Sequence, residues 1–395
     1  MIQAQRSLRA NIERSWNRGK SILLLGPRQT GKTTLAKTFD FDLAVQLLSS
    51  SLRREYEKNP DLILREVAAL RLKRPAKILV DEIQKVPELM DSIQLLIDEK
   101  KAQFFITGSS ARKLKQQADM NLLPGRVIFY RLDGLMLGEL IEVQKQNIEE
   151  LIYYGQLPEV VYSTELEQKS ELLLSYVEVY LEEEIRKEAA LRKLPDFYRF
   201  LEHAASHGSQ VVSYSGIAQN IGVSHVTVKS YYELLETTLV ADRIDPIITS
   251  KTRKKLVRSP RYLFFDLGVQ RVAAGESAPL PKSVFGHYFE CWVGLELLKI
   301  TRARRMEISL HFWQDPQTAE VDWVLKKNQT YLPIEVKLAT QVKASDAKHL
   351  RQFMREYDCP KGAIVVYTGQ TRQLLDEAIC VVPYHQLDAE LARFL

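Results

Sequence analysis

The sequence predicts an α/β protein of several domains, and three observations lead to this prediction. The 395 residues are enough for about two to four domains, at roughly 100 to 200 residues each. Residues 21–140 alternate short apolar runs with helical stretches, which is typical of a parallel sheet flanked by helices. From residue 283 a helical stretch again precedes β-type runs, so a second, mixed α/β domain is expected.

The composition is that of an ordinary folded protein. Hydrophobic residues make up 45% of the chain and charged residues 27%, which excludes a disordered or collagen-like protein. The three cysteines have no CxxC spacing, so neither a disulfide framework nor a zinc site is expected. No apolar run reaches the roughly 18 residues of a membrane span, and the N-terminal stretch is polar, so we expect a cytoplasmic protein without membrane contact. The net charge of +5 permits a polyanionic partner without requiring one.

Changes in residue pattern divide the chain into four expected segments. Residues 1–140 form the first α/β domain. Strand signals vanish over residues 141–205, where a Glu- and Leu-rich stretch with apolar residues at helical spacing predicts a helical connector. Residues 206–275 combine short helices, a basic stretch and a strand, which predicts a winged helix. Residues 276–395 form the second α/β domain.

The first chemical motif is a glycine-rich loop between an apolar strand and a helix. It consists of Gly26, Pro27, Arg28, Gln29, Thr30, Gly31, Lys32 and Thr33, followed by Thr34. This order is the pattern of a phosphate-binding loop, in which backbone N–H groups and the positive end of the helix dipole meet the phosphates. We expect Lys32 to contact the β and γ phosphates and Thr33 to bind Mg²⁺. The motif therefore predicts a site for a nucleoside triphosphate with Mg²⁺.

Two further apolar strands end in polar residues that complete this site. The strand over residues 78–80 ends in Asp81 and Glu82, at the sheet edge where nucleotides bind in such folds. Asp81 is expected in the Mg²⁺ shell, and Glu82 is expected to orient or deprotonate the attacking water. The next strand leads into Thr107 and Ser109, whose hydroxyls we expect beside the γ-phosphate.

These segments resemble a known family. GPRQTGKT, ILVDEIQ and FFITGSSARKL are similar to the bacterial and archaeal AAA-type ATPases of the AAA_14 family, which are usually joined to a DUF4143 region. The resemblance continues through LPGRVIFYRLDGLMLGEL and YGQLPEV, so it covers nearly the whole chain. It implies hydrolysis of ATP with Mg²⁺.

The resemblance also implies a role for Arg126, which follows Gly125 just before the last strand of the first domain. This arginine would serve the nucleotide site of a neighbouring subunit as a finger, because the charge that develops on the γ-phosphate needs a further cation. Such head-to-tail contacts lead us to expect a homo-oligomer that closes into a ring. The alternative for Arg126 is a surface or salt-bridged arginine.

Residues 213–240 have the spacing of a helix-turn-helix. A helix of apolar period is followed by a turn at Gly222 and by a second helix that begins at the N-cap Ser224. The side chains expected to contact DNA are His225, Thr227 and Lys229 on this helix, and Arg253, Lys254, Lys255, Arg258 and Arg261 in a basic wing. Phosphate contact is expected rather than base-specific contact, because the helix lacks Arg, Asn and Gln. The alternative is a purely structural winged helix.

The last domain contains a second set of acids. Asp322 and the Glu335-Val-Lys337 sequence on adjacent strands resemble the PD-(D/E)XK nuclease core. The two carboxylates would hold Mg²⁺, and Lys337 would stabilise the hydroxide or the transition-state charge. Glu290 lies in an apolar helix, where burial is costly unless it meets a metal or a cation, so it is expected as a third metal ligand. The alternative is a nuclease-like fold without cleavage activity.

Together these motifs predict an oligomeric, Mg²⁺-dependent ATPase that binds DNA. Its hydrolysis would remodel DNA or move the protein along it, including branched or damaged DNA, and a Mg²⁺-dependent nuclease activity is an additional hypothesis. The alternative is an ATP-controlled binding switch, with a regulatory or defence role and a catalytically silent C-terminal platform. In a further alternative the last two domains bind proteins, and salt-dependent DNA binding would then be absent.

Overall fold

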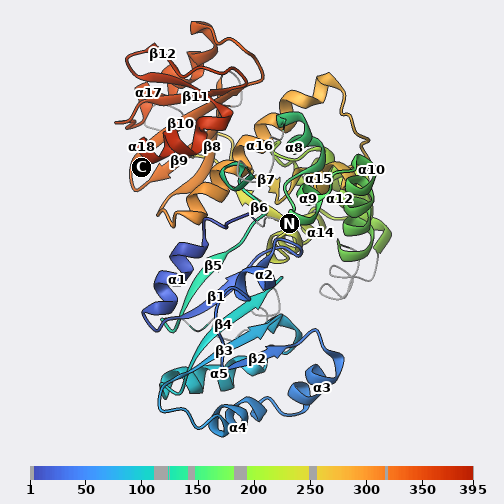
Figure 1. The fold of residues 1–395 in the computed structure, drawn as a ribbon. Helices are drawn as coiled ribbons and strands as arrows, with labels where there is room; N and C mark the ends of the chain where they lie inside the picture. The colour runs from blue at the N-terminus through green and yellow to red at the C-terminus, as the bar shows by residue number, and fades with distance from the viewer. Residues whose placement is uncertain are drawn as a thin grey trace.

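The computed structural model describes residues 4–110, 123, 125–140, 147–181, 194–248, 256–315 and 319–394. A five-stranded sheet forms its N-terminal part and a six-stranded sheet its C-terminal part, and helices with a two-stranded sheet come between them in the sequence (Figure 1). The predicted α/β class, with a parallel N-terminal sheet and a mixed C-terminal sheet, is confirmed.

The N-terminal domain is a parallel sheet with the strand order β2-β3-β4-β1-β5. Alternate residues of a strand point to opposite faces, so Phe104 and Phe105 belong to different apolar clusters. The strands are β1 Ser21–Leu25, β2 Leu43–Gln46, β3 Ala76–Asp81, β4 Ala102–Gly108 and β5 Val127–Arg131. The helices are α1 Arg9–Asn17, α2 Lys32–Ala36, α3 Ser50–Lys58, α4 Leu62–Ala69, α5 Leu89–Asp98 and α7 Leu137–Leu140, with a 3-10 turn, η1, over Ile83–Lys85.

The strand order decides where the phosphate-binding loop lies. Strand β1 pairs with β4 and β5, and β3 pairs with the other side of β4, all in parallel. The carboxyl ends of β1, β3 and β4 therefore meet at one edge of the sheet. The sheet consequently brings together the glycine-rich loop that follows Leu25, the two acids that follow Val80, and the polar residues that follow Ile106.

The middle of the chain is mainly helical, and its described core is rich in aromatic rings. Phe200 lies 4.8 Å from Tyr232 and 5.2 Å from Tyr231 between ring centroids. The elements are α8 Ile148–Tyr154, α9 Pro158–Tyr162, α10 Leu166–Ser175, a π-helical turn η2 Tyr176–Leu181, α12 Leu194–Ser206, α13 Tyr214–Ile221, α14 His225–Thr237, β6 Ala241–Ile244, β7 Arg261–Phe264 and α15 Leu267–Ala273. Strands β6 and β7 pair antiparallel. We call α12, α13, α14, β6 and β7 the three-helix unit.

Local capping explains the turn between α13 and α14. Gly222 has a φ of 82°, a left-handed conformation that favours glycine and ends α13. Ser224 then accepts a hydrogen bond from the backbone N–H of Thr227 at 3.0 Å and starts α14. Asp266 caps α15 in the same way, through the N–H of Val269 at 3.1 Å.

The C-terminal domain combines one long helix with a mixed sheet. Helix α16, Lys282–Ala303, is buried on most sides and forms much of the largest apolar cluster. The sheet order is β12-β13-β11-β10-β9-β8. The remaining elements are β8 Ser309–Asp315, β9 Ala319–Lys327, β10 Thr330–Lys337, η3 Ala344–Ala347, α17 Lys348–Glu356, β11 Ala363–Tyr367, β12 Gln373–Asp376, β13 Ile379–Pro383, η4 Tyr384–Gln386 and α18 Leu387–Phe394. No helix in the described part of the chain is long and apolar enough to cross a membrane.

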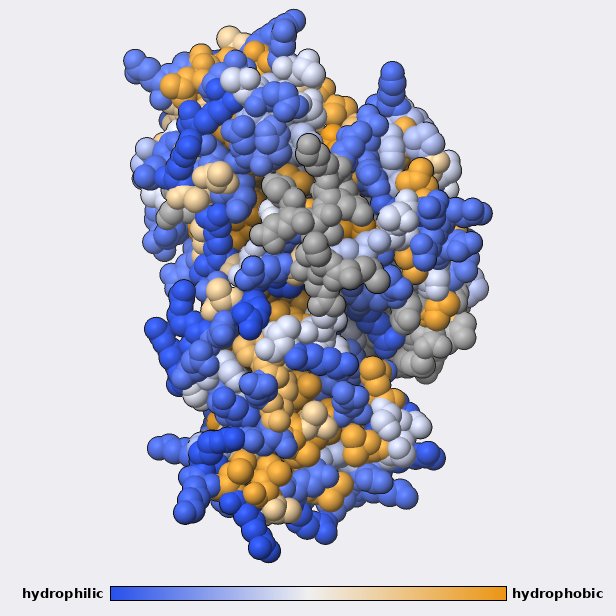
Figure 2. All heavy atoms as spheres, viewed as in Figure 1, coloured by the Kyte–Doolittle hydropathy of each residue, from blue (hydrophilic) through white to orange (hydrophobic). Residues whose placement is uncertain are grey.

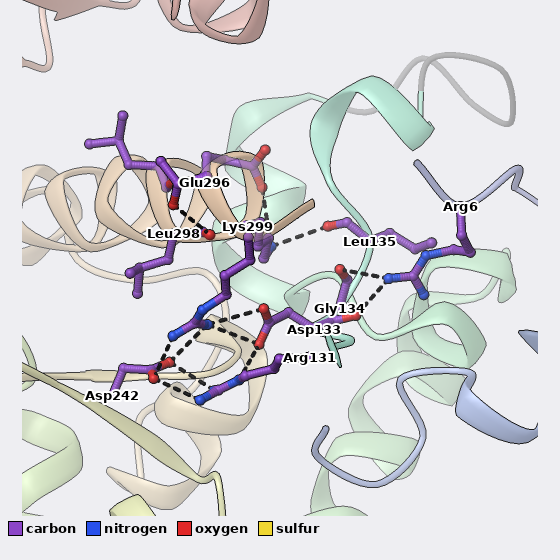
Figure 3. A network of polar contacts seen from close by, with 12 residues as sticks. Arg6, Arg131, Asp133, Gly134, Leu135, Asp242, Glu296, Leu298 and Lys299 are labelled. Atoms are coloured by element: carbon purple, nitrogen blue, oxygen red, sulfur yellow. Dashed lines mark hydrogen bonds and ion pairs between the residues drawn. The ribbon is translucent and has the colours of Figure 1, made fainter. Parts of the chain in front are cut away.

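A mostly buried group of four charged side chains, Arg131, Asp133, Asp242 and Arg302, joins the parts of the molecule (Figure 3). Asp242 of β6 accepts from Arg131 of β5 at 2.8 Å and from Arg302 of α16 at 2.6 Å. Arg302 also contacts Asp133 at 3.0 Å. Burial opposes ionisation of Asp133, but the charges of Arg302 and Arg131 outweigh it and lower the pKa of this carboxyl. The N-terminal domain, the three-helix unit and the C-terminal domain therefore meet through charged side chains.

The three-helix unit is also attached to the edge of the C-terminal sheet. The backbone N–H of Ile247, just after β6, donates to the carbonyl of Phe312 in β8 at 2.8 Å. The N–H of Val257, before β7, donates to the carbonyl of Gln314 at 3.2 Å. Both ends of the segment between β6 and β7 are thus attached to β8, which is the edge strand of the sheet.

Candidate functional site

The phosphate-binding loop depends on two glycines. A Cβ on Gly26 would lie 2.1 Å from the carbonyl oxygen of Leu132, so only glycine fits where the loop leaves β1. Gly31 has a φ of 93° and lies immediately before α2, a conformation that side chains other than glycine rarely adopt. The backbone therefore turns sharply into the helix that begins at Lys32.

Lys32 is folded over this loop. Its ammonium group donates to the carbonyl of Gly26 at 2.8 Å and to the carbonyl of Pro27 at 2.7 Å. The hydroxyl of Thr30 donates to the same Pro27 carbonyl at 2.9 Å. Lys32 is only 5% exposed, so its charge is directed into the loop rather than toward solvent.

A carboxylate and two hydroxyls meet beside the loop. The hydroxyl of Thr33 lies 3.1 Å from each carboxylate oxygen of Asp81. Thr107 donates its hydroxyl to Asp81 from β4, and its oxygen accepts the backbone N–H of Glu82 at 3.1 Å. Oxygen ligands of this kind are those that Mg²⁺ prefers, so Thr33 and Asp81 fit that ion.

Glu82 is held by its neighbours in a defined orientation. Its backbone is left-handed, with a φ of 64°, which is strained for a residue with a side chain. Its carboxylate accepts from the hydroxyl of Ser109 at 3.0 Å and from the amide of Gln84. Gln84 also donates to Ser109 at 2.7 Å. Ser109 and Thr107 are both fully buried, so their hydroxyls orient the two acids.

A cavity of about 730 Å³ lies over the loop, within the range of small-molecule sites. From the predicted set it is lined by Arg28, Gln29, Gly31, Lys32, Thr33, Thr34 and Glu82. Other parts of the chain contribute Arg6 and Arg9 near the N-terminus, Leu48, and Pro158 and Tyr162 of α9. The candidate site is therefore completed by segments that lie outside the glycine-rich loop and the two acidic strand ends.

Arg6 is the main residue of this site that sequence motifs miss. Its guanidinium donates to the carbonyl of Thr30 in the loop and to the carbonyl of Asp133, both at 2.7 Å. It also pairs with Glu139 at 3.1 Å. Figure 3 shows the guanidinium of Arg6 pointing toward Gly134 and Asp133. Arg6 therefore links the glycine-rich loop to Asp133, which follows β5 and belongs to the four-charge group.

Arg126 lies at the opposite end of the sheet from its own loop. Val127, the next residue, pairs with Ser21 at the start of β1, whereas the loop follows Leu25. At about 3.3 Å per residue, the length of β1 separates Arg126 from the loop by roughly 15 Å. Arg126 is paired with Asp98 of the same chain at 2.6 Å and is partly exposed. In this position Arg126 does not reach the loop of its own chain.

The side chains proposed to meet DNA differ in exposure. His225 and Lys229 are exposed on α14, and Arg258 is exposed before β7. Thr227 is half-buried, and its hydroxyl is 2.8 Å from that of Ser224. Arg253, Lys254 and Lys255 lie outside the described residues.

The expected acids of the C-terminal domain do come together. Asp322 of β9 accepts from the backbone N–H of Val336 in β10 at 2.7 Å, and Lys337 donates to Glu335 at 2.6 Å. Burial raises the pKa of Asp322 well above its usual range, and the charges of Glu335 and Glu290 raise it further. Burial also raises the pKa of Glu335 to about 7. The carboxylates of three elements thus share one partly buried region.

The expectation that Arg261 grips DNA phosphates is wrong. Its side chain is 3% exposed and pairs with Glu290 at 3.2 Å and with Glu320. Glu290 therefore contacts a cation. The sequence led us to expect either a metal ion or a cation beside this carboxylate, because its burial is otherwise costly. In the described part of the chain no three His, Cys, Asp or Glu side chains are arranged to hold a metal ion, so the expected metal ligands Glu290, Asp322 and Glu335 do not form such a set here. Arg261 and Lys337 already pair with two of them.

Comparison with known families covers most of the chain. Residues 18–141 match an AAA domain of the AAA_14 family. Residues 145–279 match a domain of unknown function, DUF8612, and residues 285–387 match another, DUF4143. The AAA_14 and DUF4143 resemblance identified from the sequence motifs is confirmed.

Whole-chain relatives are distant. Uncharacterized proteins of Mycobacterium bovis and Mycobacterium tuberculosis are each 25% identical over 398 residues, which cover 98% of this chain and 85% of theirs. A Cdc6p structure from Pyrobaculum aerophilum has a TM-score of 0.28 and 11% identity, covering 68% of this chain and 90% of that one. A structure of two Pif1 helicases at forked duplex DNA has a TM-score of 0.27 and 13% identity over 44% of this chain, and the match spans about half of that protein, 52%.

Proposed function

Because the chain belongs to the family of ATPases that join an AAA_14 domain to a DUF4143 domain, we propose that it couples hydrolysis of ATP to remodelling of DNA or movement along it. The main support is the convergence of Lys32, Thr33, Asp81 and Glu82 at one edge of the sheet. Hydrolysis of a triphosphate requires a cation against the phosphates, oxygen ligands for Mg²⁺ and a carboxylate that positions the attacking water. Lys32, the pair of Thr33 and Asp81, and Glu82 can supply these groups in that order.

The roles of these residues follow from their contacts. Lys32 would exchange its carbonyl partners for phosphate oxygens, and Thr33 and Asp81 would hold Mg²⁺, which supplies positive charge against the phosphates when bound. Glu82 would accept a proton from the attacking water or orient it. Ser109 and Gln84 hold the Glu82 carboxylate in place, so its position does not depend on solvent.

The three-helix unit supports DNA as the partner. His225 and Lys229 are exposed on α14, the helix that follows the turn, and exposed Arg258 follows the basic run of residues 251–255. Cations spread along such a surface suit phosphate contact, which positions a protein without reading sequence. We propose that this unit is a winged helix bound to the DNA backbone.

Charge reversal of Arg253, Lys254 and Lys255 is expected to weaken DNA binding equally for all sequences. Each lost phosphate contact should lower the slope of log affinity against log salt concentration by about 0.9. Titration of labelled duplexes of two sequences at several salt concentrations measures this. ATP turnover with single-stranded, duplex and four-way-junction DNA should lose its DNA stimulation in the same variant.

Reversal of Arg71 and Lys73, which are exposed in the N-terminal domain, serves as the matched control and should leave DNA binding unchanged. An unaltered slope in the wing variant would remove the wing from the DNA interface. Slow ATP turnover that does not respond to any DNA would instead favour an ATP-controlled binding switch.

Assembly into a ring is supported by the edge strand β5. Arg126 precedes this strand, far from its own loop, and Phe129 within it is 51% exposed. The apolar side chains at the lower end of the view in Figure 2 form a different surface of the N-terminal domain, since Figure 1 shows α4 and α5 there and β5 higher up. An exposed aromatic side chain and a cation on one edge suit contact with another copy of the chain.

Mixed subunits test this arrangement. Lys32→Ala subunits and Arg126→Ala subunits are each expected to be inactive alone, but a mixture should recover part of the ATP turnover, because some interfaces combine an intact loop with an intact arginine. ATP turnover across mixing ratios measures the recovery. Full turnover by Arg126→Ala alone, or wild-type turnover by a proven monomer, would exclude the finger in trans.

Cleavage of DNA is a second candidate function, favoured by the proximity of Asp322, Glu335 and Lys337. If cleavage occurs, wild-type protein with Mg²⁺ or Mn²⁺ should nick linear, forked or junction DNA. Asp322→Ala should stop nicking and retain ATP turnover, because the two sites are in separate domains. Gel analysis of both proteins, prepared identically, measures this. Equal nicking by both would indicate a contaminant, and no nicking by the wild type would favour the silent platform.

A further inference from the structure

An arginine from the three-helix unit lies inside the acidic region of the C-terminal domain. We call Glu290, Glu320, Asp322 and Glu335 the carboxylate cluster. Arg261 is the first residue of β7, and its guanidinium contacts Glu290 at 3.2 Å and Glu320 more closely. It also lies 3.5 Å from the backbone carbonyl of Asp322. One cation from outside the domain thus touches three residues of the cluster.

The position of Arg261 is fixed by packing as well as by charge. The guanidinium carbon is 4.2 Å from the centre of the Phe312 ring and 5.9 Å from that of Trp323. A planar guanidinium stacks on such rings while its edges bind carboxylates. With 3% of its side chain exposed, Arg261 is enclosed by this region.

The carboxylate cluster is short of positive charge. Among the described residues, its four acids face the cations Arg261 and Lys337 and the imidazole of His287. Burial raises the pKa of Glu290, and the charges of Arg261 and His287 only partly offset that effect. One carboxylate oxygen of Glu335, which is 6% exposed, is buried and has no hydrogen-bond partner among the described residues. An orphaned buried oxygen is costly, so it marks a position suited to a further cation.

We propose that Arg261 is the resident counter-cation of the carboxylate cluster and competes there with a divalent metal ion. When Arg261 holds Glu290 and Glu320, these acids are directed to the guanidinium, which explains why the expected metal ligands are not gathered around one point. Removal of Arg261 leaves the acids without that partner, and a divalent ion replaces its charge. The choice of a divalent metal ion rests on the proposed DNA cleavage, whereas the pairing of Arg261 with the acids does not.

Arg261 lies in the three-helix unit, outside the domain that contains the carboxylate cluster. Arg261 belongs to the same unit as α14, which we propose to contact DNA, and the chain before it is attached to β8 through Val257. Displacement of β7 relative to β9 would withdraw the guanidinium from Glu320 and Glu290. Metal binding in the C-terminal domain is thereby linked to the position of the three-helix unit.

Metal affinity of the full chain, without nucleotide or DNA, tests the proposal. Mn²⁺ binding is measured by calorimetry and by electron paramagnetic resonance of the free ion, for wild type, Arg261→Gln and Arg304→Gln. One nearby charge alters the proton affinity of a carboxylate by about tenfold or more, so Arg261→Gln should bind one Mn²⁺ at least about tenfold more tightly. Arg304→Gln, which replaces an exposed arginine just after α16, should match wild type. Adding Asp322→Asn to Arg261→Gln should abolish the gain.

Equal or weaker Mn²⁺ binding by a folded Arg261→Gln protein would overturn the proposal, since Arg261 would then build the region without competing for it. If circular dichroism shows that this variant does not fold, Arg261→Met removes the charge and keeps an apolar side chain against the Phe312 ring. It should bind Mn²⁺ more tightly than wild type, and unchanged affinity would again contradict the proposal. Tighter Mn²⁺ binding without nicking by any variant would refute the cleavage hypothesis alone.

Discussion

Lys32→Ala is expected to lower ATP turnover by on the order of 100-fold or more, because a positioned cation on the transferring phosphoryl group is removed. The ammonium of Lys32 lies over the loop and contacts the carbonyls of Gly26 and Pro27. At 5% exposure it has no free path to solvent, so its charge acts inside the site. Phosphate release at saturating ATP and Mg²⁺ measures the loss.

Lys37→Ala is the matched control, since Lys37 is exposed just after the same short helix. It should retain wild-type turnover. Because Lys32→Ala also loses two hydrogen bonds within the loop, thermal unfolding of both variants should be compared. Wild-type turnover by Lys32→Ala would remove the loop from catalysis, whereas a large fall in the unfolding temperature would show that the effect is structural.

Glu82→Gln is expected to retain ATP but hydrolyse it about 100-fold more slowly or worse, which is the usual contribution of a general base. The amide keeps the size of the side chain and its contact with Ser109, which lies 3.0 Å from the carboxylate, but it cannot take a proton from water. Filter binding of labelled ATP and single-turnover phosphate release separate retention from hydrolysis.

The control for this variant is Glu88→Gln, an exposed glutamate at the start of α5. It should hydrolyse ATP as the wild type does. Loss of ATP binding by Glu82→Gln would indicate that the carboxylate organises the cavity. Rapid phosphate release would remove Glu82 from its proposed role and direct attention to another water-positioning group.

The sequence by itself determined the parallel sheet and the nucleotide loop, because both depend on short-range patterns. Gly26 and Gly31 are needed for local backbone geometry, and Lys32 and Thr33 follow within the same turn. The contribution of Asp81 was predictable for a related reason, since parallel strands bring their carboxyl ends to one edge. Spacing of two residues on β10 likewise placed Glu335 and Lys337 together.

The tertiary structure alone decided the partners of the charged side chains. Arg258 and Arg261 are three residues apart and chemically identical, yet one is exposed and the other is 3% exposed between acids of α16 and β9. Arg6 reaches the loop from a segment without any motif. The physical reason is that a charged side chain pairs with the groups that packing of distant elements places within a few ångströms of it. The spacing of residues along the sequence does not predict how those elements pack.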